Sequence, residues 1–255
     1  MPKFSDKQYF SDWQWLSGEL AHEITGREIL EVQKLLPNKF FATGLQLGIP
    51  CGRSYFSKVD GSMQIFVNTN LALPDSMQEI QLDRHVLSDV NQLPFGRRAA
   101  DLIIMPHTLD LKYSPIHVLR EVSQIIDDDG ILALTGFNPM SFMGVSKLIT
   151  KKIKRRKDVP PSYTPGRVKE WLQLIGFEVT ASCYIDYLPP INHAGVRKAL
   201  GFVDKAGERW WPVFAGVYII IAKKQNWIPE KISMFDSIKN RLNRKFPQPA
   251  TRHHV

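Results

Sequence analysis

The sequence predicts an α/β fold built on a doubly wound, mostly parallel sheet with helices on both faces. Strand-like apolar runs alternate with helical patterns between residues 40 and 224, and this alternation is typical of parallel sheets. The run DLIIMP at 101–106 is continuously apolar after its first residue, as a strand buried on both faces should be. The long connection 186–212 fits a last strand inserted antiparallel. A ligand site is expected at the carboxyl ends of the first and fourth strands.

An amphipathic helix is expected first, over about 11–36. Ser11 and Asp12 can cap it, apolar residues recur at three- and four-residue steps, and Pro37 lies just beyond its end. Strands are then expected in chain order at 40–48, at 63–68, somewhere within 80–87, and at 101–106, 131–137, 177–185 and 213–224.

Two later helices carry clear start and stop signals. Ser114 followed by Pro115 opens the first, because serine caps a helix and proline fits its first turn. The acidic run 127–130 is expected to end that helix and lead into the strand 131–137. Thr164 and Pro165 repeat the same opening, and this helix is expected to stop at Gly176.

The net charge of the chain is concentrated in two short segments. The 255 residues hold 33 Lys and Arg against 25 Asp and Glu, a formal charge of +8. Segment 147–157 holds seven of these bases and segment 239–255 holds five, and neither holds an acid. The remaining 21 bases face 25 acids, so the rest of the chain carries −4. The composition excludes a disordered, collagen-like or disulfide-rich protein, and no uniformly basic surface is expected.

The domain organisation is predicted as one domain over 1–230 and a basic, flexible tail over 231–255. A basic insert is expected at about 142–162, where apolar residues of one helical face oppose Lys and Arg. This pattern is typical of a helix that binds an anionic membrane surface or a partner protein. The alternatives are a segment that contacts RNA and a solvated basic loop. The two cysteines and the polar N-terminus indicate a cytoplasmic protein, which would be peripheral to the membrane if the insert binds lipid. The cysteines do not have the spacing of metal ligands, so no metal is expected.

Residues 93–139 resemble a known family. An LPF turn leads to a strand that begins with Asp101, then to the loop HTLD, a helix reading VLREV, an acidic-Gly turn and a further strand. This order resembles the class I S-adenosylmethionine-dependent methyltransferases of the type 11 group. The segments FNPMSFMG and RVKEWLQLIGF resemble an uncharacterised bacterial subgroup of it. The resemblance covers about 13–224 and implies a Rossmann-like methyltransferase sheet and S-adenosylmethionine as cofactor.

The resemblance also implies a set of cofactor-binding residues. The family places an acid and three glycines after the first strand, where this chain has Gln46, Gly48, Pro50 and Gly52. Proline removes an N–H and fixes φ, and the exchange of the acid for Gln46 forfeits about 1 kcal/mol of a charge-assisted bond. A tight strand-to-helix turn without cofactor binding is the alternative. The remaining positions of the set are Asn68 or Asn70 for the ribose, Asp89 or Asp83 for the adenine, and Pro106.

The candidate chemistry follows the fourth and fifth strands. By the resemblance, His107 lies beside the transferred methyl group, and its ordinary pKa suits proton removal from an acceptor; a purely structural role in its loop is the alternative. Asp110 and Asn138 are the candidate substrate residues, although Asn138 would equally well cap a turn. We therefore expect methyl transfer to a small-molecule acceptor. A degenerate scaffold without efficient cofactor use and an RNA methyltransferase are the alternatives.

Overall fold

The computed structural model describes residues 19–48, 53–57, 59–68, 85–111, 114–142, 144–145, 162–187, 210–211 and 214–225. The chain divides into residues 1–225 and residues 226–255, and the second part contains no described residue. The expected helix start at Ser11, the segment 147–157 and the basic tail therefore lie outside the described residues. The domain boundary at residue 230 stays a prediction.

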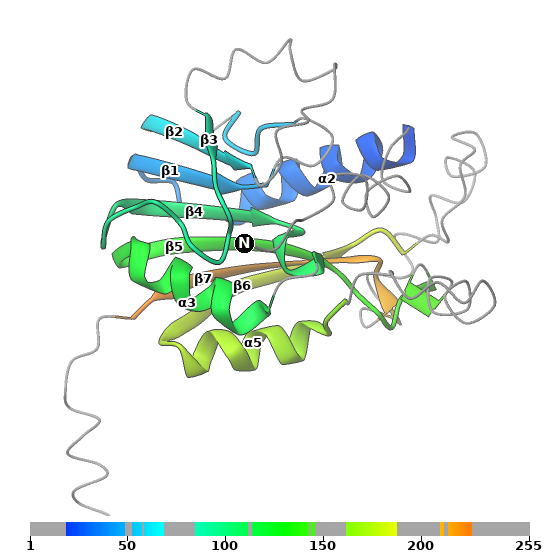
Figure 1. Ribbon diagram of the computed structural model, residues 1–255. Helices are drawn as coiled ribbons and strands as arrows, with labels where there is room; N and C mark the ends of the chain where they lie inside the picture. Colours follow the sequence, from blue (N-terminus) through cyan, green and yellow to red (C-terminus); the bar gives the residue numbers. More distant parts are fainter. Residues whose placement is uncertain are drawn as a thin grey trace, which may run out of the picture. The chain divides into compact units, whose positions relative to one another are not determined.

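The described strands form a single sheet in the order β3-β2-β1-β4-β5-β7-β6 (Figure 1). Pairing is parallel from β3 through to β5, whereas β7 runs antiparallel to both β5 and β6. This arrangement confirms the predicted fold class and the antiparallel last strand. The strands are β1 (Phe41–Leu47), β2 (Gly61–Asn68), β3 (His85–Leu87), β4 (Ala100–Pro106), β5 (Ile126–Phe137), β6 (Phe177–Ile185) and β7 (Val217–Lys224).

Helices cover both faces of the sheet, as predicted. Helix α2 (Glu19–Leu35) packs Ile29 and Val32 against the face that presents Leu102 and Ile104 of β4. Helices α3 (Pro115–Ile125) and α5 (Pro165–Leu174) pack against the opposite face, which presents Leu45 and Ile103. A continuous apolar run such as β4 is needed here because both of its faces are buried.

The predicted caps of the two later helices are confirmed. Ser114 is the N-cap of α3 with Pro115 in the first turn. The Thr164 hydroxyl accepts a hydrogen bond from the Arg167 N–H at 3.4 Å at the start of α5. Gly176 follows α5 with φ of 91°, a conformation that glycine adopts without steric cost.

The acidic run after α3 is a bulge inside β5 rather than a separate turn. Strand β5 begins at Ile126, directly after the helix, and its pairing with β4 shifts register between Ala100 and Leu102. Asp129 has φ of 64°, which bends the chain at this point. A bulge of this kind lets extra residues leave the ladder while the strand continues. The predicted strand start at 131 is therefore corrected to 126, and that of the last strand from 213 to 217.

Asp101 fixes the register of the two central strands. Its carboxylate accepts hydrogen bonds from the backbone N–H groups of Ala42 and Thr43 at 2.7 and 2.9 Å. These donors belong to the amino end of β1, so the acid at the start of β4 aligns the carboxyl ends of both strands at the opposite edge.

The connection between β1 and β2 is short for a parallel crossover. It spans the 13 residues 48–60, and its described residues, 48, 53–57 and 59–60, include a turn at 55–57 and no helix. Tyr55 and Phe56 of this connection are buried and pack with Ile29 and Val32 of α2. On this face of the sheet, α2 and the connection that follows β1 therefore pack side by side over the strands.

Candidate functional site

The carboxyl ends of β1 and β4 meet at Gly48. Its φ of 91° turns the chain away from β1, and its N–H donates to the Val67 carbonyl at 2.8 Å. The Thr108 hydroxyl donates to the Leu47 carbonyl at 2.7 Å and so ties the loop after β4 to the end of β1. A Cβ on Gly48 would lie 3.7 Å from the Pro106 carbonyl oxygen. Two predicted cofactor residues, Gly48 and Pro106, thus lie side by side.

The Gln46 side chain holds the ends of the cofactor loop together. It is fully buried, and its amide nitrogen donates to the carbonyls of Gly48 and Arg53, each at 3.0 Å. Its amide oxygen accepts from the Tyr55 N–H at 2.9 Å. Two of these three bonds need a donor, which an acid cannot supply. This geometry explains why glutamine replaces the family acid; a direct contact of Gln46 with a cofactor stays a prediction.

Gln46→Glu is expected to lower the free energy of unfolding by about 3 kcal/mol, because it sets a buried carboxylate against two carbonyl oxygens. Urea denaturation measures this loss. Gln173→Glu is the matched control, since Gln173 is exposed on α5. Equal stability of the two variants would contradict the role given to Gln46.

Asp89 lies two residues beyond β3, at the same edge of the sheet. Its side chain is exposed, and its Oδ1 accepts from both the backbone and side-chain N–H groups of Asn91 at 2.9 Å. This turn holds the carboxylate in a fixed position. Asn68 ends β2, but its side chain is not described. Gly52, Asn70 and Asp83 lie outside the described residues.

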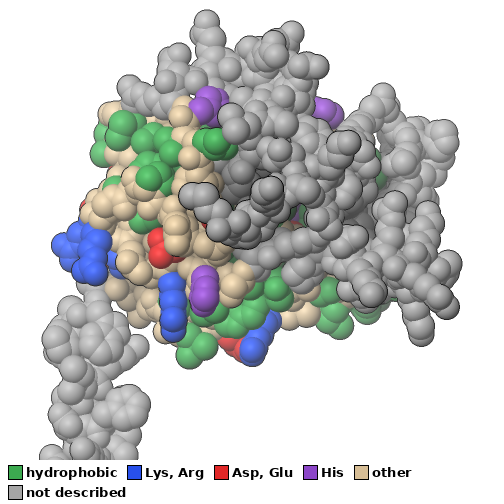
Figure 2. All heavy atoms as spheres, in the orientation of Figure 1, with side chains coloured by type: hydrophobic (Ala, Val, Ile, Leu, Met, Phe, Trp, Pro, Cys, Tyr) green, Lys and Arg blue, Asp and Glu red, His purple; other side chains and the backbone are tan. Residues whose placement is uncertain are grey.

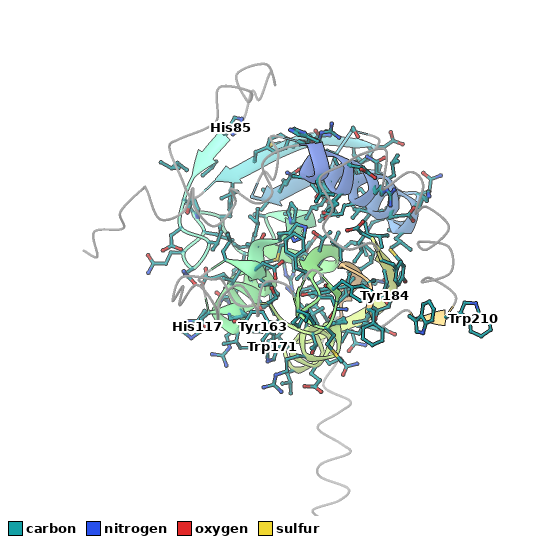
Figure 3. All side chains as sticks on the ribbon, turned by 90° about the vertical axis from the view of Figure 1, so that its right-hand side faces the viewer. His85, His117, Tyr163, Trp171, Tyr184 and Trp210 are labelled. Carbon is teal, nitrogen blue, oxygen red and sulfur yellow. The ribbon has the colours of Figure 1, made fainter. Side chains whose placement is uncertain are left out.

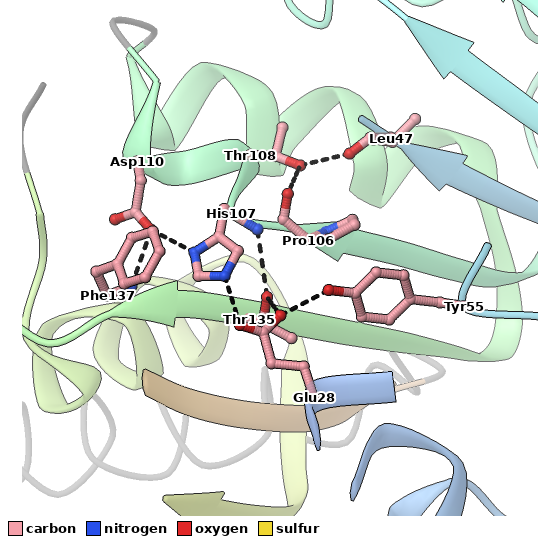
Figure 4. A network of polar contacts seen from close by, with 9 residues as sticks. All are labelled: Glu28, Leu47, Tyr55, Pro106, His107, Thr108, Asp110, Thr135 and Phe137. Carbon is pink, nitrogen blue, oxygen red and sulfur yellow. Dashed lines mark hydrogen bonds and ion pairs between the residues drawn. The ribbon is translucent and has the colours of Figure 1, made fainter. Parts of the chain in front are cut away.

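His107 stands at the centre of a buried polar network (Figure 4). Its backbone is left-handed, with φ of 51°, and this turn directs the imidazole beneath the ends of β4 and β5. Nδ1 lies 3.0 Å from Asp110 Oδ2, and Nε2 lies 2.8 Å from Glu28 Oε1. The ring stacks on Phe137 with centroids 3.9 Å apart. Both ring nitrogens are therefore bonded to carboxylates.

The Glu28 side chain, which reaches the network from α2, is completely buried. Its Oε2 accepts from the Tyr55 hydroxyl at 2.6 Å and from the Thr135 hydroxyl at 3.3 Å. The same carboxylate thus joins α2, the connection after β1, the end of β4 and the end of β5. A buried carboxylate is tolerated only when its oxygens are satisfied in this way.

The pKa of His107 is raised from its ordinary value to about 9. Burial alone would lower this pKa, but the charge of Glu28 and the hydrogen bonds to Asp110 and Glu28 outweigh that effect. His107 is therefore an imidazolium at neutral pH and donates from both ring nitrogens. An imidazolium has no lone pair for accepting a proton, so this geometry favours the structural alternative over general-base catalysis.

Asn138 caps the turn after β5. Its side-chain nitrogen donates to the Ala215 carbonyl at 3.0 Å, and its side-chain oxygen accepts from the Met140 N–H at 3.1 Å. These bonds join the end of β5 to the segment that precedes β7. Contact of Asn138 with a substrate stays a prediction.

The described residues contain neither a metal site nor a membrane-spanning helix. No group of three His, Cys, Asp or Glu side chains among them is placed to hold a metal ion. None of the helices in the described ranges is long and apolar enough to cross a bilayer. On the face in Figure 2, the described Lys and Arg side chains are scattered rather than gathered in one patch. The segment 147–157, predicted to contact membrane or RNA, lies outside the described residues.

Comparison with known proteins places the chain by its fold. No family model matches it. The uncharacterised protein YafS of Escherichia coli K12 is 31% identical over 167 residues, which make up 66% of this chain. The chain covers 65% of the length of YafS.

Two solved structures with a similar fold identify the fold class. A chain solved in complex with the Trm112 methyltransferase activator of Haloferax volcanii superposes with a TM-score of 0.62 at 13% identity, over 88% of this chain and 100% of that one. An S-adenosylmethionine-dependent methyltransferase from Archaeoglobus fulgidus gives 0.57 at 18% identity, over 85% and 99%. The fold is that of class I S-adenosylmethionine-dependent methyltransferases.

Within this methyltransferase fold, the predicted residues fall into two groups at one edge of the sheet. Gly48, Asp89 and Pro106 lie at or just beyond the ends of β1, β3 and β4. Asp110 and Asn138 lie near the end of β5, where the Phe137 N–H donates to Asp110 Oδ2 at 2.8 Å. The first group adjoins the glycine turn after β1, and the second lies on the side of β7.

Sequence reasoning missed Glu28, Tyr55 and Thr135. A signal for Glu28 was present, because it falls between Ile24 and Val32 on the apolar stripe of its helix, at steps of four residues. A carboxylate at such a position must find a partner inside the protein. Tyr55 and Thr135 give no comparable signal, since both types are common in apolar runs.

Proposed function

We propose that this chain transfers a methyl group from S-adenosylmethionine to a small-molecule acceptor. The observation that carries the proposal is the joined end of β1 and β4, where Gly48 in a positive-φ turn and Pro106 face each other within a methyltransferase fold. A ligand at this edge would lie against backbone that only glycine allows to approach closely.

The residues on this edge fit the proposed cofactor. Asp89 offers an exposed carboxylate, already oriented by its turn, for the adenine amino group. Gly48 and Pro106 would line the methionine side, and Asn68 would reach the ribose. The buried contacts of His107 with Glu28 and Asp110 hold the loop after β4 at this edge. When bound, S-adenosylmethionine supplies a methyl group activated on a sulfonium.

The residues of this chain position the reactants rather than exchange protons. Methyl displacement from a sulfonium has a good leaving group and depends mainly on alignment. His107 is bonded on both sides and holds the loop after β4 in place. We therefore assign it as a positioning residue in the proposed reaction.

Calorimetric titration with S-adenosylmethionine and S-adenosylhomocysteine tests the proposal. We expect both to bind, and we expect Asp89→Ala to weaken binding about tenfold or more, because a charge-assisted hydrogen bond is lost. Asp60→Ala is the control, since this exposed carboxylate precedes β2 at the opposite edge. Absence of heat with either ligand at several hundred micromolar would contradict the proposal.

A second candidate function is a methyltransferase-like binding protein without efficient cofactor use. One observation favours it: the Gln46 side chain is bonded within its own loop, where the family has an acid. The same titration separates the two candidates. The likeness to YafS supports a place in the uncharacterised bacterial subgroup. An anionic membrane or RNA remains our proposal for the partner of segment 147–157.

A further inference from the structure

Two fully buried polar atoms near the end of β5 lack a hydrogen-bond partner among the described residues. They are Oδ1 of Asp110 and the hydroxyl of Tyr218. Asp110 is 5% exposed and Tyr218 is 0% exposed. In Figure 4 the second carboxylate oxygen of Asp110 points away from the imidazole that binds the first. Unpartnered buried atoms are rare in folded proteins and each needs an explanation.

The two atoms belong to one small region. Tyr218 on β7 pairs with Gly136 on β5, and a Cβ on Gly136 would lie 2.3 Å from the Tyr218 hydroxyl oxygen. The phenol therefore crosses β5 at a point that only glycine leaves open. The next residue, Phe137, donates its N–H to the Asp110 carboxylate at 2.8 Å. The phenol of Tyr218 and the carboxylate of Asp110 thus contact two consecutive residues of β5, Gly136 and Phe137.

Tyr163, two residues before α5, packs against the hydrophobic cluster that contains Tyr218. Burial raises the pKa of the Tyr163 hydroxyl, and the Asp110 carboxylate raises it further. The pKa of Tyr218 is also raised well above its ordinary value, first by burial and then by Asp110 and Tyr163. Tyr163 packs edge-on against Trp171 with ring centroids 5.0 Å apart, and Figure 3 shows the two on the α5 side.

We infer that Asp110 Oδ1 and the Tyr218 hydroxyl, bordered by Tyr163, form a subsite for an ammonium group. The inference rests on the proposed function. An ammonium group supplies several N–H donors and one positive charge, which match the unpartnered carboxylate oxygen of Asp110 and the phenol oxygen of Tyr218. An anion would be repelled by the Asp110 carboxylate, and a neutral group would lack the charge that attracts an ammonium group to it.

Two ligands of a methyltransferase carry such a group: an amine acceptor and the methionine part of the cofactor. The subsite lies between β5, β7 and the start of α5, whereas Gly48 and Asp89 lie toward β1 and β3. This separation favours an amine acceptor over the cofactor as the molecule whose ammonium group binds here. Each of the two molecules is tested in a separate arm of the experiment.

The first arm titrates the full-length protein with benzylammonium chloride and with benzyl alcohol, its neutral counterpart, followed by saturation-transfer NMR. We expect benzylammonium to bind at least tenfold more tightly. Asp110→Asn should remove this preference while keeping an acceptor for the Phe137 N–H, and Tyr218→Phe should weaken benzylammonium binding at least threefold. Asp128→Asn is the control, because Asp128 lies in the bulge at the amino end of β5.

The second arm compares S-adenosylhomocysteine with 5′-methylthioadenosine, which lacks the methionine ammonium. If that ammonium occupies the subsite, Asp110→Asn weakens S-adenosylhomocysteine about tenfold and leaves 5′-methylthioadenosine unchanged. A preference for the ammonium ligand that depends on Asp110 in either arm supports the subsite, and the arm in which it occurs shows whether the acceptor or the cofactor supplies the ammonium group. The inference is overturned if neither arm shows a preference for the ammonium ligand, or if Asp110→Asn leaves the preference unchanged in both arms. If wild-type protein binds neither nucleoside, the proposed function fails, and the first arm still decides on the subsite.

Thermal denaturation separates loss of the subsite from misfolding. Because the Tyr218 hydroxyl has no partner among the described residues, Tyr218→Phe should leave the Tm unchanged or raise it while weakening benzylammonium. A fall in Tm of several degrees would show that the hydroxyl has an internal partner, and it would overturn the inference.

Discussion

Glu28→Ala is expected to lower the free energy of unfolding by about 4 kcal/mol. The substitution removes the carboxylate that accepts from His107, Tyr55 and Thr135. It leaves a buried imidazolium with one carboxylate instead of two, and two buried hydroxyls without their acceptor. Removal of one partner from a buried ion pair typically costs about 3 to 5 kcal/mol, because the desolvation of the remaining charge is no longer offset.

Glu31→Ala on the same helix is the matched control for this prediction. Glu31 pairs with Lys34 at 2.6 Å, but Lys34 is largely exposed, and such surface pairs contribute about 1 kcal/mol or less. Urea denaturation followed by circular dichroism gives both values. If Glu28→Ala costs no more than Glu31→Ala, the network does not stabilise the protein as described. Glu28→Gln should lie between the two, since it keeps the shape of the side chain and loses its charge.

Local signals made the strands and the later helices predictable. The run 101–106 is apolar after its first residue, 177–185 is rich in β-branched and aromatic residues, and both end at clear breaks. Ser114 and Thr164, each followed by proline, mark the helix starts within one residue. Each of these signals acts between residues that are close in the sequence. The acidic bulge at 127–130 was harder to predict, because Asp and Gly favour turns whether or not a strand continues through them.

The candidate site was only partly predictable, because its partners come from distant positions. The resemblance and the position after the fourth strand pointed to His107 and Asp110, but Glu28 lies 79 positions before the histidine it binds. Without that partner, a lone histidine after a strand resembles a general base with an ordinary pKa. With it, the imidazole is a buried cation. In the same way, Gln46 resembled a weakened cofactor ligand until the carbonyls of Gly48 and Arg53 showed why the side chain must donate.

The pH dependence of stability is the second large effect that we expect. The folded pKa of His107 is about 9, and its ordinary value in an unfolded chain is 6.5. A raised pKa means that the folded state binds the proton more tightly. The stabilisation is therefore fully present below pH 6.5, decreases as the pH rises, and is lost above about pH 9. A difference of this size corresponds to a loss on the order of 3 kcal/mol.

Urea denaturation at intervals between pH 6 and 9.5 measures this decrease, and ¹⁵N NMR of the imidazole reports the titration of His107 directly. The groups that face the ring are Glu28 from α2 and Asp110 from the loop after β4, with Tyr55 behind Glu28. His107→Gln should be less stable at every pH and should lose the slope between pH 7.5 and 9, because glutamine carries no proton that titrates there. His117→Gln, at an exposed position on α3, should keep the wild-type slope. A wild-type slope that persists in His107→Gln would assign the proton to another group, and His107 would then be neutral between its two carboxylates.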